Sequence, residues 1–326
     1  MPLSLFTRNR KALLSRCQDD YATKMRLKYA PYYHAMEAQT GTNVRLNGRD
    51  MIMLSSNDYL GLSFHPKVIE AGQAAMSKWG TSTTGARTSN GSRFYHVELE
   101  EKLAEFLGRE ACHIHVAGYL SCLSSVAAFA QKGDLILADR LVHASMLDGI
   151  MASGARLRRF AHNDLDALEL MLHEEPALDG VIFVVTESVY SMDGDSPDLK
   201  RLASLRKRFG FCWVLDEAHA TGWYGATGSG LQEAQGAFAA ADIVVGTLGK
   251  GLGSQGAYVL SHAPEVRDAL INFAGEFVYS TYLAPSCAAA ALAAVERVKG
   301  MSGERAELHA LSHAWRDGLI EAGFAV

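Results

Sequence analysis

Two short apolar runs near the middle of the chain constrain its fold more than any other feature. FCWVLD (211–216) and DIVVGT (242–247) are rich in β-branched and aromatic residues, and each ends in a polar residue. Such runs are typical of buried parallel strands, and ligands of open α/β sheets bind at the carboxyl ends of these strands. The two runs therefore predict an α/β protein with a site where the strands end.

Three side chains that follow these runs have complementary chemistry. Asp216 and His219 lie in DEAHATG after the first run, and Lys250 lies between glycines in GTLGKGLGS after the second. A buried lysine loses its proton readily and can form a Schiff base, and glycines allow a close approach of backbone and cofactor. A carboxylate at a strand tip can keep a pyridine nitrogen protonated, and an imidazole can reach the ring hydroxyl. Singly, each residue could be an unrelated loop residue; together they predict a site for pyridoxal 5'-phosphate (PLP) with Lys250 as its covalent partner.

The rest of the chain alternates between strand-like and helix-like patterns. Asn47-Gly48 between two apolar-rich runs predicts a hairpin, and Asn163 is the expected N-cap of the helix that follows it. Repeated strand and helix units imply a mostly parallel sheet flanked by helices. The expected helices are 10–29, 66–78, 96–107, 119–130, 164–172, 197–209, 264–274, 285–299 and about 304–321, and the main expected strands are 111–116, 134–139, 155–160, 180–188, 211–216, 242–247 and 256–260.

The motifs DEAHATG and GTLGKGLGS resemble those of the α-oxoamine synthases, fold-type I PLP-dependent transferases. Five further segments appear in the family's order between about residues 30 and 300: SSNDYLGL (55–62), GARTSNGSRFYHVELE (85–100), DRLVHASMLDG (139–149), ESVYSMDGD (187–195) and FVYSTYLAP (277–285). The resemblance implies an enzyme that condenses an amino acid with an acyl-CoA and releases carbon dioxide.

The same resemblance implies roles for individual residues. Lys250, Asp216, His219 and His143 would be catalytic, with His143 stacked on the pyridine ring. The other cofactor contacts would be Gly118, Tyr119, Ser191 and Thr247, together with Ser280 and Thr281, which reach the cofactor phosphate of a neighbouring subunit. Asn57 would contact the substrate. Local alternatives stay open for several of them: turn geometry at Gly118, an interior hydrogen bond at His143, and helix caps at Asn57 and at Ser280-Thr281.

Within the family, two pairs of segments point to different branches. FAHND and GTLGKGLGSQGAYV are most similar to the 8-amino-7-oxononanoate synthases, which join alanine to a pimeloyl thioester in biotin synthesis. TSTTGAR and GLQEAQG resemble segments of the serine palmitoyltransferases almost as closely. A synthase like glycine C-acetyltransferase and a PLP-binding protein without synthase activity are the remaining alternatives.

Composition limits the location and the partners of the protein. The net charge of −5 provides no general attraction to nucleic acid or to an anionic membrane, and no apolar run reaches the length of a membrane span. The five cysteines are scattered and have no metal-ligand spacing, and the basic N-terminus lacks the apolar stretch of a signal peptide. We therefore expect a cytoplasmic protein without a bound metal. The resemblance implies in addition a homodimer with acyl-CoA and a small amino acid as substrates.

The length predicts one large domain and a smaller one. We expect an N-terminal helix and hairpin over residues 1–54, a large PLP-binding domain over 55–300, and the start of a small C-terminal domain over 301–326. The resemblance implies several tens of further residues, including an arginine for the substrate carboxylate, so we expect this small domain to be incomplete and amino-acid binding to be weak. Asn57 and Arg87 are the first residues to test for that role within the chain.

Overall fold

The computed structural model describes residues 3–29, 32–175 and 179–325, and the chain divides into two compact units, residues 1–55 and 56–326. The first unit contains helix α1 (Leu3–Leu27) and an antiparallel sheet of β1 (Ala38–Thr40), β2 (Asn43–Leu46) and β3 (Arg49–Ile52). Asn47 and Gly48 have φ angles of 52° and 71°, which the two-residue turn of a tight hairpin requires. The predicted helix and hairpin are confirmed.

The second unit is built on a seven-stranded sheet with the order β4-β10-β9-β8-β7-β5-β6. Strands β9, β8, β7, β5 and β6 run parallel to one another, whereas β10 is antiparallel to both β4 and β9. The mostly parallel sheet predicted from the alternating pattern is confirmed. The strands are β4 (Ala111–His115), β5 (Leu135–Asp139), β6 (Arg156–Phe160), β7 (Ile182–Glu187), β8 (Cys212–Asp216), β9 (Ile243–Thr247) and β10 (Ala257–Ser261).

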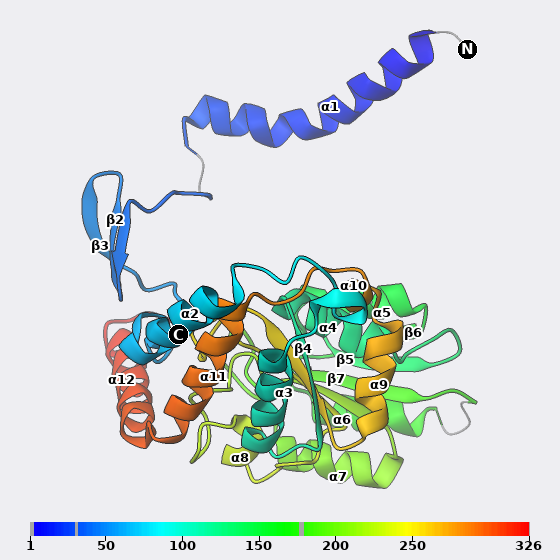
Figure 1. Cartoon of the computed structure of the whole chain (residues 1–326). Coiled ribbons are helices and arrows are strands. Elements are labelled where there is room, and N and C mark those ends of the chain that lie inside the picture. Colours follow the sequence, from blue (N-terminus) through cyan, green and yellow to red (C-terminus); the bar gives the residue numbers. More distant parts are fainter. Residues whose placement is uncertain (1–2, 30–31, 176–178, 326) are drawn as a thin grey trace. The chain divides into compact units, whose positions relative to one another are not determined.

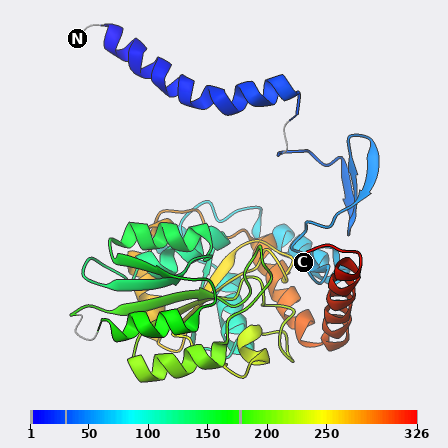
Figure 2. The ribbon, with the colours of Figure 1, turned by 180° about the vertical axis from the view of Figure 1, so that it is seen from behind.

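Helices cover both faces of this sheet. Figures 1 and 2 show α4 and α5 on one face and α6 and α7 on the other, with α2, α3 and α11 packed together beside the sheet. The helices are α2 (Pro66–Trp79), α3 (Phe94–Phe106), α4 (Gly118–Ala127), α5 (Ala144–Ser153), α6 (Leu165–His173), α7 (Leu199–Phe209), α8 (Leu231–Ala234), α9 (Pro264–Phe273), α10 (Gly275–Val278), α11 (Pro285–Lys299) and α12 (Ser302–Glu321), with short turns of helix at Leu62–Phe64 and Arg87–Gly91.

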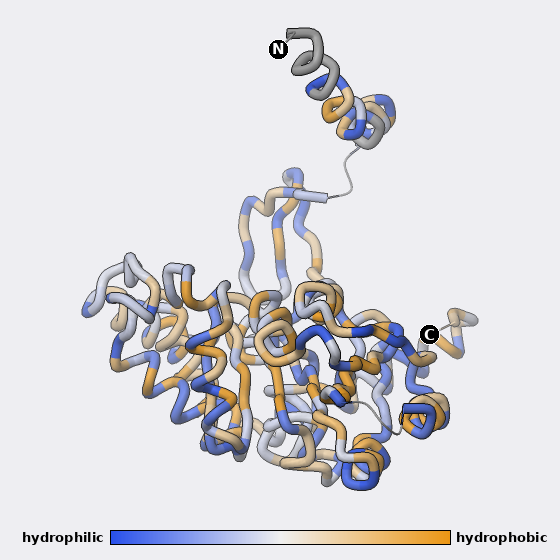
Figure 3. Tube along the Cα trace, turned by 90° about the vertical axis from the view of Figure 1, so that its right-hand side faces the viewer, coloured by the Kyte–Doolittle hydropathy of each residue, from blue (hydrophilic) through white to orange (hydrophobic). Residues whose placement is uncertain are grey.

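The core of the second unit lies in the central strands. All residues of β4, β5, β9 and β10 are buried. Figure 3 shows hydrophobic stretches of the chain, in orange, running through the interior of this unit. Because both faces are covered, β5, β9 and β10 are apolar up to their last residue, whereas β4 contains the buried His113 and His115. Within the described residues, no helix is both long and apolar enough to cross a membrane.

The N-cap of α6 differs from the prediction. Asp164, and not Asn163, caps this helix: its side chain accepts a hydrogen bond from the backbone N–H of Ala167 at 2.9 Å. Asn163 has a positive φ of 54°, and its side chain donates to Asp195 at 2.8 Å. The prediction was wrong because a tertiary contact holds the asparagine side chain away from the helix.

Candidate active site

The carboxyl ends of β7, β8 and β9 open into a cavity of about 140 Å³. The first turns of α4 and α5 complete its wall. The residues that line it are Gly118, Tyr119, Cys122, His143, Ser145, Glu187, Asp216, Ala218, His219, Thr247 and Lys250. Seven predicted site residues from four separate segments therefore lie around one cavity: Gly118, Tyr119, His143, Asp216, His219, Thr247 and Lys250.

Lys250 ends a chain of three polar side chains. Its Nζ lies 2.6 Å from Nε2 of His219, and the hydroxyl oxygen of Tyr59 lies 2.6 Å from Nδ1 of the same imidazole. Burial lowers the pKa of Lys250, and burial together with the charge of Lys250 lowers the pKa of His219 to about 4. The imidazole is therefore neutral at pH 7, and one of its nitrogens accepts a hydrogen bond while the other donates one.

The backbone around Lys250 is closely packed. A Cβ atom at Gly251 would lie 2.5 Å from the backbone oxygen of Thr221, which is less than a real contact allows. Gly251 is therefore required by the approach of the segment that follows Asp216 and His219. Gly251, directly after Lys250, therefore lets the segments that follow β8 and β9 meet.

Asp216 is held at the tip of β8 by two donors. It is 5% exposed, and its Oδ1 accepts a hydrogen bond from the backbone N–H of Ala218 at 2.8 Å. The thiol of Cys122 in α4 donates to Oδ2 across 3.4 Å. Burial, followed by the charge of Asp216, raises the pKa of this thiol, so Cys122 keeps the proton that it donates.

Glu187 at the tip of β7 is a residue of this site that the sequence did not identify. It is paired in register with Asp216, and its Oε1 accepts a hydrogen bond from the backbone N–H of His143 at 2.6 Å. Burial and the neighbouring charge of Asp216 raise the pKa of Glu187 to about 8. The available signal was an acidic residue that ends an apolar strand in ESVYSMDGD, the same pattern that identified Asp216. Tyr59, which follows Asn57 in SSNDYLGL, was missed as well.

The start of α4 can bind an anion. Gly118 is its first residue, and the N–H groups of a first helical turn carry partial positive charge. The hydroxyl of Thr247 is next to it, since a Cβ atom at Gly118 would lie 3.4 Å from Thr247 Oγ1. Beside them, the rings of Tyr119 and His143 are 6.4 Å apart at an angle of 76°, and Nδ1 of His143 lies 2.6 Å from Ser145 Oγ.

Four predicted residues are not among the described residues that line the cavity: Asn57, Ser191, Ser280 and Thr281. Ser191 lies exposed in the loop after β7, and Ser280 and Thr281 lie between α10 and α11. Asn57 reaches the site only through Tyr59, whose hydroxyl oxygen lies 3.5 Å from Asn57 Oδ1. Their roles stay predictions.

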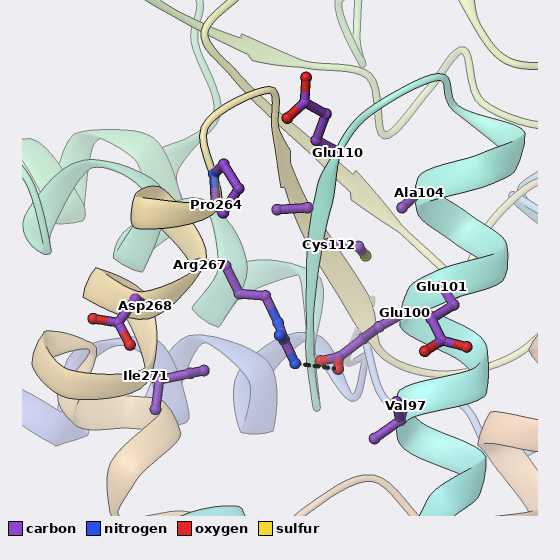
Figure 4. Close-up of a pocket in the computed structure, with 11 residues that line it drawn as sticks. Val97, Glu100, Glu101, Ala104, Glu110, Cys112, Pro264, Arg267, Asp268 and Ile271 are labelled. Carbon is purple, nitrogen blue, oxygen red and sulfur yellow. Dashed lines mark hydrogen bonds and ion pairs between the residues drawn. The ribbon is translucent and has the colours of Figure 1, made fainter.

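Arg87 belongs to a second cluster, in which it pairs with the buried Glu100. Glu100 and Arg267 line a hollow between α3, β4 and α9 (Figure 4). The guanidinium of Arg87 donates to both oxygens of Glu100, at 2.5 and 3.2 Å, and Arg267 donates to Glu100 Oε2 at 3.1 Å. Burial opposes the charge of Glu100, but contact with His113 and the charge of Arg87 outweigh burial and lower the pKa of Glu100 to about 2. Arg87 is therefore already held by a carboxylate.

The side chains around the first cavity fit a phosphorylated pyridine aldehyde. The start of α4 and Thr247 suit a phosphate, the buried Asp216 suits a protonated ring nitrogen, and Lys250 has an amine whose pKa is lowered toward the neutral form. In the part of the chain that the structure describes, no three His, Cys, Asp or Glu side chains gather as metal ligands do. The donor set therefore suits PLP.

Comparison with known proteins places the chain among PLP enzymes. The family model of aminotransferase class I and II matches residues 49–326. The chain is similar to the 8-amino-7-oxononanoate synthase of Geotalea daltonii, with 41% identity over 291 residues that cover 89% of this chain and 74% of the relative. It is similar in structure to a serine palmitoyltransferase from S. paucimobilis with a bound PLP-myriocin aldimine, with a TM-score of 0.92, 32% identity, and coverage of 96% of this chain and 79% of that one. The serine palmitoyltransferase of Sphingomonas wittichii has a TM-score of 0.90 and 33% identity, with coverage of 95% and 78%.

Proposed function

Because this chain belongs to the class I and II aminotransferase family and, within it, to the α-oxoamine synthases, we propose that it is an 8-amino-7-oxononanoate synthase. The proposed reaction joins alanine to a pimeloyl thioester and releases CoA and carbon dioxide. One observation carries the proposal: Lys250 Nζ, with its lowered pKa, shares a cavity with Asp216 at the neighbouring strand tip. The 41% identity to a synthase of this name supports the choice within the family.

The cavity residues have separable tasks in this proposal. PLP, when bound, supplies an aldehyde that bonds to amines and a ring that accepts the electron pair left on the amino acid's Cα. Asp216 would keep the proton on the ring nitrogen, while the start of α4 and Thr247 would bind the phosphate. His143 lines the same cavity and would cover one face of the ring, and Glu187 fixes its position by accepting a hydrogen bond from its backbone N–H.

Lys250 moves the proton of the substrate. Its Nζ takes the proton from Cα of the amino acid, which requires an unprotonated amine, and burial favours that form. Nε2 of His219 is 2.6 Å away and orients the amine, and Tyr59 fixes the imidazole from its other side. Both neighbours are neutral at pH 7, because burial raises the pKa of Tyr59 and burial lowers that of His219.

Release of free CoA tests this function directly. Alanine with pimeloyl-CoA should give the highest rate, and the Lys250→Ala variant should give none. Serine with palmitoyl-CoA is the principal alternative, because the two solved structures described above are serine palmitoyltransferases; glycine with acetyl-CoA is the next pair to compare. PLP binding without CoA release from any pair would identify a PLP-binding protein without synthase activity.

The assembly is part of the proposal. We propose a cytoplasmic homodimer in which Ser280 and Thr281 reach the cofactor phosphate of the partner subunit. Their position between α10 and α11, away from the cavity lining of their own chain, supports this arrangement. Co-expression of Lys250→Ala with a Ser280→Ala/Thr281→Ala chain tests it. A shared site should restore part of the activity in the mixed dimer, whereas a monomer that binds PLP tightly and turns over would rule it out.

A further inference from the structure

Two buried carboxyl groups lie side by side in the proposed PLP site. Glu187 ends β7 and Asp216 ends β8, the two strands are parallel neighbours, and the two residues are paired in register. Both line the cavity, and their exposed fractions are 3% and 5%. Two carboxylates in such a position repel each other in a medium of low dielectric constant, so one of them holds a proton at neutral pH.

Hydrogen bonding determines which of the two stays charged. Asp216 accepts from the N–H of Ala218 and from the thiol of Cys122, and each donor stabilises its ionised form. Glu187 has the backbone N–H of His143 as its donor. The geometry therefore leaves the carboxyl group of Glu187 protonated.

Other ionisable groups around Glu187 act in both directions. Asp139, at the end of the adjacent strand β5, adds negative charge and favours the neutral acid, whereas Lys250 adds positive charge and favours the carboxylate. The imidazoles of His143 and His219 and the thiol of Cys122 also face the cavity. The net result is a pKa of Glu187 raised to about 8, mainly by burial and by Asp216.

We propose that Glu187 is the proton-releasing acid of this site: it carries a proton in the ligand-free protein and gives it to solvent when a cationic pyridine ring is placed against Asp216. The ring nitrogen neutralises the charge of Asp216, which removes the main electrostatic reason for Glu187 to stay neutral. The O–H bond of the carboxyl group breaks, the proton passes to water, and the carboxylate remains beside the ring. This inference rests on the proposed function, because it requires the cavity to bind a PLP-like ring.

Calorimetry with pyridoxine 5'-phosphate tests the proposal. This probe has the ring and the phosphate of PLP but no aldehyde, so Lys250 forms no covalent bond that would itself release a proton. Titrations in two buffers with different ionisation enthalpies give the number of protons released. At pH 7 the wild-type protein should release up to about one proton more than Glu187→Gln, and the difference should vanish above about pH 9, where Glu187 is already ionised.

Glu217, which directly follows the end of β8, provides a matched control. Glu217 is 1% exposed and accepts hydrogen bonds from Ser188, Leu231 and Gln232, but it is not among the cavity residues. Glu217→Gln should release as many protons as the wild-type protein. Equal release by wild type and Glu187→Gln across this pH range would overturn the inference and leave the cofactor site intact. Failure of the probe to bind the wild-type protein would overturn both this inference and the proposed function.

A second measurement needs no variant. The infrared difference spectrum on binding the same probe should show loss of a protonated-carboxyl C=O band, and that band should shift when the protein is labelled with ¹³C-glutamate. A probe-induced spectrum without a glutamate-derived carboxyl band would contradict the proposal, even if Glu187→Gln did not fold.

Discussion

Glu100 and Glu187 are both buried glutamates, yet their surroundings favour different protonation states: Glu100 is an ionised carboxylate at pH 7, and Glu187 is a neutral acid. Glu100 lies between Arg87 and Arg267, and its pKa is lowered to about 2. Glu187 lies beside Asp216, and its pKa is raised to about 8. Burial disfavours the charged form at both positions, so the neighbours, and not the depth, decide the charge.

The difference separates a structural cluster from a chemical one. Glu100 joins α3 to β4 and α9, because its carboxylate accepts from Arg87, from Arg267 and from the backbone N–H of Ile114 at 3.1 Å. Glu187 and Asp216 instead place two like groups together, which disfavours the folded state unless a ligand compensates. Variants of Glu100 should therefore mainly change stability, whereas variants of the residues that line the proposed PLP site should mainly change activity.

Lys250→Ala should have the largest effect, and on activity alone. CoA release should fall by about 10⁴-fold or more, which corresponds to more than about 5 kcal/mol of barrier, because the group that bonds the cofactor and accepts the Cα proton is removed. The free energy of unfolding, measured by urea denaturation, should change by less than about 1 kcal/mol, since a partly buried amine is replaced by a methyl group. Borohydride reduction and peptide mapping should place the pyridoxyl label on Lys250 of the wild-type chain; a label on another lysine would refute the assignment.

Glu100→Gln should have the largest effect on stability. Removal of one partner of a buried ion pair lowers the free energy of unfolding by about 3–5 kcal/mol, because Arg87 stays buried without its counter-charge. The pKa of Glu100 is lower in the folded chain than in the unfolded one, so its contribution is present above about pH 4.5 and is lost as the pH falls toward about 2. Urea denaturation between about pH 7 and pH 3 should show a steeper loss in the wild-type protein than in the variant.

Glu101 is the control for this prediction. It lines the same hollow as Glu100 but is exposed, so Glu101→Gln should change the free energy of unfolding by less than about 0.5 kcal/mol. Equal effects of the two substitutions would mean that the buried ion pair does not stabilise α3 against β4 and α9.

Asp216→Asn should lower activity by about 10²-fold, or about 2.7 kcal/mol of barrier, while PLP still binds. A neutral amide cannot keep the ring nitrogen protonated, so exchange of the Cα proton of alanine should slow by a similar factor. Nuclear magnetic resonance in deuterium oxide measures this exchange. A normal exchange rate in the variant would contradict the role of Asp216.

Glu187→Gln should have the smallest effect. It should raise the free energy of unfolding, whereas Glu100→Gln should lower it. Its pKa is higher in the folded chain than in the unfolded one, so ionisation of the unfolded chain lowers the stability of the wild-type protein as the pH rises from about 4.5 to about 8. Glutamine avoids this cost and should raise the free energy of unfolding by about 1–3 kcal/mol at pH 7. Urea denaturation at about pH 4 and pH 7 measures it, and a loss of stability at pH 7 would remove the contrast with Glu100.

Local patterns in the sequence determined most of the elements of this protein. Continuous apolar runs predicted β5 and β9, the alanine-rich composition of residues 285–299 predicted α11, and Asn47-Gly48 predicted the β2–β3 turn. These predictions succeeded because apolar periodicity and turn chemistry act within a few residues. The motifs around Asp216 and Lys250 also identified the centre of the site, because Asp216 ends β8 and Lys250 lies three residues after the end of β9, its parallel neighbour.

Tertiary structure alone decided which side chains became neighbours. The sheet order places β7 beside β8, so Glu187 meets Asp216, and it brings Tyr59 to His219 from a distant loop. The pairing of Arg87 with Glu100 and the contact that draws Asn163 away from α6 arose in the same way. Strand order and side-chain contacts between distant segments leave no local pattern, and a pKa depends on those contacts; the charges of the two buried glutamates therefore became apparent only in the folded chain.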